Sequence, residues 1–273
     1  MRFAQSSFVY FNYPLQEAIR RLHRFGYQGV EFWGGRPHAY RHDLDHELDA
    51  IRSLLDRLGM TMPNFIPAQF RYPSVLCTTN EAVRKDSVNY IKDSIRTAQR
   101  LGAPSVSLCA GMTLFGEDIE TSWAQLRRSI VELLDDTEQS DLLLLIEPAH
   151  PAESKLIQTI NDSLHMINEI KCPRLGVLLD TGHCHVNGED LAEAVRRLKG
   201  IPFHVHIDDN NGDSDAHNIP GLGTIAFAPF VAALGEVGYQ GFVSAELGFQ
   251  YTMDPDAAVE KTYAALTSIF KTP

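Results

Sequence analysis

Short strand-like runs alternate with amphipathic helical stretches along the whole chain, and this alternation limits the fold more than any other feature. The first helical stretch places Leu15, Ile19 and Leu22 at helical spacing, and Gly26 follows as a helix stop. Eight strands are predicted, over residues 2–10, 29–33, 62–66, 105–109, 142–147, 175–180, 203–208 and 242–246. Further helices are predicted over residues 80–101, 121–138, 161–170, 190–198, 227–237 and 256–270.

Several of these strands are nearly continuous runs of Leu, Val and Ile, as expected for parallel strands that are buried on both faces. Eight βα units in 273 residues predict an α/β fold, a (β/α)8 TIM barrel, that forms one domain over residues 1–273. The sequence GYQG occurs at 26–29 and again at 238–241, each time between a helix and a strand, which supports a repeated unit. A doubly wound sheet is the alternative, but its usual G-x-G-x-x-G after the first strand is missing.

Charge and cysteine content narrow the class of function. The chain has 24 basic and 35 acidic residues, a net charge of −11, and no cluster of Lys and Arg, which disfavours nucleic acid and anionic membrane partners. A small polar substrate fits this balance better. No apolar run reaches the roughly 18 residues of a membrane span. The four cysteines are far apart and form no C-x-x-C pair, so we expect a reduced, cytoplasmic setting without a zinc knuckle or a disulfide framework.

Four consecutive predicted strands end in side chains that can bind a metal ion. Glu147 ends the fifth, Asp180 the sixth, His206 lies near the end of the seventh and Glu246 ends the eighth. In a TIM barrel these strand ends meet at one mouth, where active sites lie. One such carboxylate alone more often caps a helix, but several carboxylates crowded together would repel one another unless a cation neutralised them. The pattern therefore predicts a metal site.

The donor set indicates which metals would suit such a site. Two Glu, one Asp and one His are rich in oxygen and carry a single imidazole, which suits Mn²⁺, Mg²⁺ or Co²⁺ better than a thiolate-rich set would. We expect Mn²⁺. Such an ion can polarise a carbonyl oxygen and hold a substrate through two neighbouring oxygens.

Six segments give the chain a family resemblance over its whole length: GVEFWGG, LLLIEP, LLDTGH, HVHIDD, the IPGLG loop and VSAEL. With them the chain resembles the xylose isomerase-like barrel family of sugar isomerases and epimerases. The stretch EFWGGRPHA, at residues 31–39, looks most like fructoselysine 3-epimerase and the related tagatose and allulose 3-epimerases. The resemblance implies a metal-dependent enzyme that acts on a small sugar and assembles as a homodimer or homotetramer.

The resemblance also implies residue roles. Glu147, Asp180, His206 and Glu246 would hold the metal, and the two glutamates would exchange a proton with the ketose C3 from opposite faces, through a metal-stabilised enediolate. This agrees with the chemistry, because a proton next to a ketone is weakly acidic and inversion needs a base on one face and an acid on the other. His183 matches a substrate-contacting position of these epimerases, the alternative being a loop cap.

Other polar residues near the predicted mouth are less distinctive. Arg36 and His38 lie in the matched stretch and are predicted to contact substrate, although the segment can also be read as a solvated loop. His185 is predicted to be a loop histidine. His204 shares strand parity with His206, so both could face inward, with His204 either supporting the site or lying in the core.

Asp215 and His217 raise a nuclease alternative. An Asp-x-His ahead of a glycine loop also occurs in related apurinic endonucleases, where both residues bind additional zinc. Those enzymes also need histidines from two further strand loops, which MPNFIPAQF and SVSLCAGM lack, and the net charge opposes DNA. We therefore predict that His217 contacts substrate.

The substrate and reaction stay open at this stage. The family's glycine loop usually reads P-G-E-G, whereas this chain has Leu222 in place of the glutamate, and D-T-G-H is a general superfamily pattern. A ketose 3-epimerase acting on a free or amine-linked ketose is favoured. The alternatives are an aldose–ketose isomerase of the hydroxypyruvate type, an inosose dehydratase, and a non-catalytic sugar-binding barrel.

Overall fold

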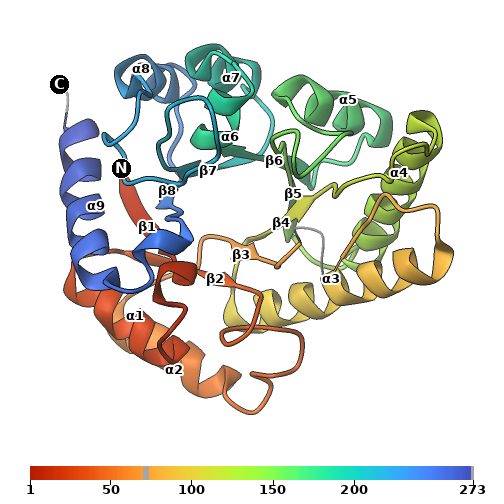
Figure 1. Ribbon diagram of the computed structural model, residues 1–273. Helices are drawn as coiled ribbons and strands as arrows, with labels where there is room; N and C mark the ends of the chain where they lie inside the picture. Colours follow the sequence, from red (N-terminus) through yellow and green to blue (C-terminus); the bar gives the residue numbers. More distant parts are fainter. Residues whose placement is uncertain (70–73, 272–273) are drawn as a thin grey trace.

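Eight parallel strands close into a barrel in chain order, β1 to β8, and helices surround it (Figure 1). The computed structural model describes residues 1–69 and 74–271. β8 pairs with β1 to close the ring. The predicted (β/α)8 barrel is confirmed. The strands are β1 Arg2–Ser6, β2 Gly29–Trp33, β3 Phe65–Ile66, β4 Ser105–Cys109, β5 Leu143–Glu147, β6 Leu175–Asp180, β7 Phe203–Ile207 and β8 Phe242–Ala245.

The helices form the outer layer of the barrel (Figure 1). None of the helices within the described residues combines the length and apolar character that crossing a lipid bilayer would require. They are α1 Leu15–Arg24, α2 Leu48–Leu58, α3 Glu81–Leu101, α4 Ile119–Asp136, α5 Ile160–Ile170, α6 Thr181–Val186, α7 Leu191–Arg197, α8 Phe227–Glu236 and α9 Pro255–Ile269, with short 3-10 helices η1 Ser7–Tyr10 and η2 Phe249–Tyr251.

Each of the two GYQG sequences ends one helix of the barrel and leads into the next strand. Gly26 and Gly238 both have positive φ, 93° and 72°, directly after α1 and α8. The next residue donates its backbone N–H five residues back in both cases, Tyr27 to Leu22 and Tyr239 to Leu234. Glycine is favoured there because a side chain would strain the left-handed conformation. The repeat therefore marks helix ends that lead into β2 and β8.

Two predicted strands were too long, each for a local reason, and two helices were not predicted. The first strand ends at Ser6, not at residue 10, because the Ser6 side chain accepts a hydrogen bond from Phe8 N and starts η1. The third strand is shorter than predicted, since Pro63 has no N–H to give to a ladder. Helix α6 occupies residues that were predicted to form a loop, and α2 was not among the predicted helices.

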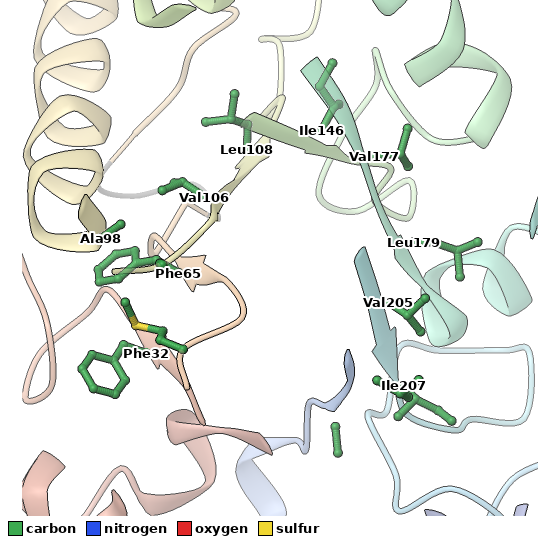
Figure 2. Close-up of a cluster of buried hydrophobic side chains, with 14 of the residues drawn as sticks. Phe32, Phe65, Ala98, Val106, Leu108, Ile146, Val177, Leu179, Val205 and Ile207 are labelled. Atoms are coloured by element: carbon green, nitrogen blue, oxygen red, sulfur yellow. The ribbon is translucent and has the colours of Figure 1, made fainter. Parts of the chain in front are cut away.

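Side chains alternate along each strand between the helix layer and the barrel interior. Val177 and Leu179 of β6 are buried in the apolar core, and Figure 2 shows them on the same side of the strand. Asp180 follows the alternate parity, as do His204 and His206 on β7, where Asp180 and His206 are partners in the ladder. The alternation thus directs these three polar side chains away from the helix layer.

Candidate functional site

The four predicted strand-end side chains come together at the carboxyl ends of β5 to β8. Glu147, Asp180, His206 and Glu246 each offer one ligand atom, and these atoms all lie within 4.8 Å of one another. His206 Nδ1 lies 3.0 Å from Glu246 Oε2, 3.9 Å from Asp180 Oδ2 and 4.0 Å from Glu147 Oε1. Three carboxylates thus surround one imidazole nitrogen.

The two oxygens of Asp180 do different things. Its Oδ1 accepts a hydrogen bond of 2.9 Å from His183 N and caps the start of α6. Its Oδ2 is buried and has no hydrogen-bond partner among the described residues. A buried carboxylate oxygen without a partner is costly, so it indicates a missing ligand. An oxygen-rich set with one imidazole and one such oxygen fits a hard divalent cation.

The two glutamates experience opposite electrostatic effects. Burial, together with the nearby negative charges of Glu246 and Asp180, raises the pKa of Glu147 to about 8 despite the opposing imidazoles of His183 and His206. Burial would also raise the pKa of Glu246, but its hydrogen bond and charge interaction with His206 lower it below the ordinary value. In the absence of a cation, one carboxyl group of the pair is therefore protonated near neutral pH and the other is ionised.

His183 is buried and belongs to α6, not to a loop. Its Nδ1 donates to Pro148 O at 2.9 Å and its Nε2 donates to Asp215 Oδ2 at 3.2 Å. Pro148 O can only accept, and so can an ionised Asp215, so in the absence of a cation both ring nitrogens carry hydrogen and the ring is an imidazolium. Burial opposes this charge, but Asp180 and Asp215 raise the pKa of His183 well above its ordinary value.

A second group of side chains surrounds Asp215 in the loop between β7 and α8. His217 Nε2 lies 2.8 Å from Asp215 Oδ2, and His217 Nδ1 lies 2.8 Å from Asp208 Oδ2. His183, Asp215 and His217 also lie close enough to share a cation. Burial raises the pKa of Asp208 to about 7, with the charge of Asp180 adding to the effect. Asp208 and Asp215 therefore hold the two ring nitrogens of His217, and Asp215 also contacts His183.

A cavity of about 460 Å³ opens above these residues, a volume that suits a small molecule. Its polar lining includes Glu153 and His183, and an aromatic wall is formed where Trp33 packs against Phe8. The full lining is Phe8, Trp33, Ile66, Pro67, Ala68, Gln69, Cys109, Glu147, Glu153, His183, His217, Glu246, Leu247, Gly248 and Phe249.

Two predicted substrate contacts are not among the residues that line this cavity. His38 is fully buried, where its ring nitrogens bond Ser7 Oγ at 3.0 Å and Tyr13 O at 3.1 Å. Arg36 is largely exposed and bonds Asp43 through two nitrogens. In this structure two buried hydrogen bonds therefore hold His38 and an ion pair holds Arg36, both outside the cavity lining.

The sequence did not single out Glu31 or Glu153 as site residues. Glu31 lies in β2 and bonds both His204 and His206. Its only sequence signal is a carboxylate inside the otherwise apolar GVEFW run, at an inward position. Glu153 follows β5 in an irregular loop, where sequence periodicity gives no orientation. His185 bonds Thr224 Oγ1 at 2.9 Å, away from the cavity lining.

A family model described as "Xylose isomerase-like TIM barrel" matches residues 19–269. Fructoselysine 3-epimerase of Shigella flexneri is 30% identical to this chain over 243 residues, which cover 89% of the chain and 88% of that relative.

Two solved structures of low sequence identity share the fold. L-ribulose 3-epimerase superposes with a TM-score of 0.85 at 19% identity, over 99% of this chain and 94% of the other. The IOLI protein with a binding zinc atom also gives a TM-score of 0.85 at 19% identity, over 99% and 98% of the two chains.

Proposed function

Because this chain belongs to the xylose isomerase-like TIM barrel family and is an enzyme of the sugar epimerase and isomerase class, we propose that it is a metal-dependent ketose 3-epimerase. Its substrate would be a free ketose or a ketose linked to an amine. The observation that carries the proposal is the convergence of Glu147 and Glu246 with Asp180 and His206 within 4.8 Å at the barrel mouth. We also propose that residues 1–273 form one domain and that the protein is cytoplasmic.

The metal site proposed here consists of Glu147, Asp180, His206 and Glu246. Mn²⁺ is the ion we expect, since three carboxylates and one imidazole favour a hard cation. When bound, the ion would polarise the ketose carbonyl and so make the neighbouring C3 proton more acidic.

The two glutamates would move the proton. Inversion at C3 needs a base on one face of the carbon and an acid on the other, and two carboxyl groups that flank one cavity meet this need. The pair would exchange these roles in the reverse reaction.

His183 and His217 would contact the sugar oxygens. Both side chains line the cavity, and Asp215 lies within 3.2 Å of a nitrogen on each. Their raised pKa values favour positive charge, and a positive ring held in one orientation attracts a hydroxyl or carbonyl oxygen. Trp33 would supply an apolar face for the sugar ring.

A heavy-water experiment tests the proposed reaction. Metal-loaded protein is incubated with a panel of ketoses in D₂O, including an amine-linked fructose, and the label is located by NMR. Deuterium at C3 together with the C3 epimer would support the proposal. Deuterium at C1 or C2 would indicate an aldose–ketose isomerase, and loss of water from an inosose would indicate a dehydratase. In a separate assay, cleavage of DNA at an abasic site by the metal-loaded protein would indicate the nuclease.

A further inference from the structure

A buried group of hydrogen bonds crosses the barrel interior beneath the proposed metal site. Glu31 of β2 is fully buried, and its Oε2 accepts a hydrogen bond of 2.9 Å from His206 Nε2 on β7. Its Oε1 accepts a hydrogen bond from His204 Nε2. β1 and β8 separate β2 from β7 in the barrel, so the contact spans the interior rather than a ladder.

The Glu31 carboxylate is held in place from other strands as well. Asn64 Nδ2 donates to Glu31 Oε2 at 3.2 Å, and Ser105 Oγ of β4 donates to Asn64 Oδ1 at 2.9 Å. Ser244 Oγ of β8 lies 3.0 Å from His204 Nε2. Both carboxylate oxygens are therefore occupied and the group has a single orientation.

The hydrogen bonding fixes which nitrogen of His206 is available. An ionised carboxylate can only accept, so His206 Nε2 must carry the hydrogen that it shares with Glu31. In a neutral imidazole the lone pair then lies on Nδ1. That nitrogen faces Glu246, Asp180 and Glu147, at 3.0, 3.9 and 4.0 Å.

We propose that Glu31 is a positioning residue that holds His206 as its Nε2–H tautomer and so presents Nδ1 to the metal. The inference rests on the metal site of the proposed function but concerns a residue outside that site. Outer partners of metal-bound histidines orient the ring and increase its basicity, and losing one typically costs about 10- to 100-fold in metal affinity. His204 and Asn64 support the same carboxylate and keep it from turning.

Two substitutions separate the charge of Glu31 from its hydrogen bond. In Glu31→Gln the amide oxygen can still accept from His206 while the negative charge is lost. In Glu31→Leu both are lost. We expect the Mn²⁺ dissociation constant of the metal-free protein to rise by about 10-fold in the first variant and by about 100-fold in the second. Free Mn²⁺ is measured by electron paramagnetic resonance, with circular dichroism showing that each variant is folded.

Ser107→Ala is the matched control. It removes a buried side-chain hydrogen bond of β4, from Ser107 Oγ to Phe65 O at 3.4 Å, and leaves the hydrogen bonds of Glu31, His204 and His206 in place, so its Mn²⁺ affinity should stay close to that of the wild type. Equal losses in Ser107→Ala and Glu31→Gln would indicate a general packing effect and overturn the proposal. Unchanged affinity in both Glu31 variants would overturn it too. If each Glu31 variant bound one ion fewer per chain than the wild type at saturating Mn²⁺, Glu31 would itself be a metal ligand, and the proposal would be overturned.

The ring nitrogen of His206 that binds the metal can be identified directly, and a role of Glu31 in packing alone would not determine which nitrogen it is. In protein labelled with ¹⁵N-histidine and loaded with ¹¹³Cd²⁺, cadmium coupling should appear at His206 Nδ1 while Nε2 keeps its hydrogen. Coupling at Nε2, or a wild-type protein that binds no divalent ion, would overturn the proposal. The proposed function fails separately: if no ketose exchanges its C3 proton but the affinity order and the coupling hold, only the reaction assignment is wrong.

Discussion

The two oxygens of Asp180 have different surroundings, and this allows its structural role to be separated from its proposed role as a metal ligand. Oδ1 caps α6 through His183 N, while Oδ2 points toward His206 without a hydrogen-bond partner among the described residues. We predict that Asp180→Asn keeps the cap but weakens Mn²⁺ binding by more than the 10- to 100-fold typical of an outer hydrogen bond. Asp180→Ala should also lose about 1 kcal/mol of unfolding free energy from the cap. Calorimetric titration and urea unfolding measure the two effects.

Asp190 provides the control for this pair. Its side chain caps α7 through Glu193 N at 2.9 Å, at an exposed position outside the cavity lining. Asp190→Ala should therefore lose a similar unfolding free energy, about 1 kcal/mol, with no change in Mn²⁺ affinity. If Asp180→Asn bound Mn²⁺ as tightly as the wild type, Asp180 would not be a ligand.

Each of the two glutamates should remove the C3 proton from a different epimer. We predict that Glu147→Gln and Glu246→Gln each reduce epimerisation at saturating metal by roughly 100- to 10,000-fold, the range for loss of a general acid or base. Under the proposed mechanism, the remaining carboxylate would still face one side of C3. Each variant should therefore exchange the C3 proton of one epimer with D₂O faster than it forms the other epimer, and the two variants should prefer opposite epimers.

A surface glutamate controls for the loss of a charge. Glu236 forms an ion pair with Arg196 on the outer helices, so Glu236→Gln should leave turnover unchanged. Near-normal turnover in either Glu147→Gln or Glu246→Gln would contradict a mechanism that needs two bases.

The sequence predicts site residues that lie at strand ends better than site residues that lie elsewhere. Glu147, Asp180, His206 and Glu246 could be predicted together because parallel strands end at one barrel mouth. The Glu31 contact could not, since it joins residues 175 positions apart, and no local pattern reports on that pairing. His38 was assigned to substrate because it lies in a matched segment, but burial against Ser7 and Tyr13 determines its contacts.

At the scale of elements, Asp209 organises the loop that carries Asp215 and His217. Its Oδ2 accepts from Gly221 N at 2.8 Å and Gly223 N at 2.9 Å, and its Oδ1 accepts from Ile225 N at 3.1 Å. A Cβ at Gly223 would lie only 2.3 Å from Asn210 O, so glycine is required by this close approach. The fold of the loop thus depends on Asp209 and its glycines.

We predict that Asp209→Asn loosens this loop. The amide nitrogen cannot accept from Gly221 and Gly223, and hydrogen bonds to a charged group contribute roughly 1.5 to 3 kcal/mol each. Hydrogen exchange should accelerate at those two amides, and the KM for the ketose should rise because His217 is held less firmly. Unchanged exchange at both amides would contradict this account.

Leu222 is a control within the same loop. Its side chain is 63% exposed, so the loop conformation does not depend on the residue at this position. Leu222→Glu, which restores the family's usual residue, should change the unfolding free energy by less than about 0.5 kcal/mol.

Helix periodicity predicted most helices within about two residues of their observed bounds, the short α7 included, but it missed α2 and α6. Helix α1 has buried residues at helical spacing, Leu15, Ile19 and Leu22, and was predicted within a residue of its observed bounds. Helix α6 has only six residues, TGHCHV, which carry little helix propensity and no periodic pattern. It forms because Asp180 caps it directly after β6, a contact set by the strand end rather than by the helix sequence.

At the scale of the whole molecule, the barrel mouth gathers more acidic groups than its imidazoles balance, and the metal-free protein retains protons there. The pKa of Glu147 is raised to about 8 and that of Asp208 to about 7, chiefly by burial. Nearby carboxylates, despite burial, also raise the pKa of His183, His206 and His217 well above the ordinary value. Between about pH 5 and pH 8 the folded protein therefore binds more protons than the unfolded chain.

Folding stability should consequently fall as pH rises through this window when no metal is present. Each excess proton changes the unfolding free energy by about 1.4 kcal/mol per pH unit. Glu31, Asp215 and Glu246, whose pKa values are lowered, are ionised in both states above about pH 5 and do not affect the slope. His38 and His150, whose pKa values burial lowers, oppose the trend near pH 6, but they are fewer than the groups with raised pKa values. Mn²⁺ bound at the proposed site would displace protons from its ligands, so its stabilising effect should grow from pH 6 to pH 8. Urea unfolding at pH 6, 7 and 8, with and without Mn²⁺, measures both slopes. A metal-free protein whose stability rose toward pH 8 would show that the mouth is not proton-loaded, and a pH-independent effect of Mn²⁺ would mean that the ion binds elsewhere.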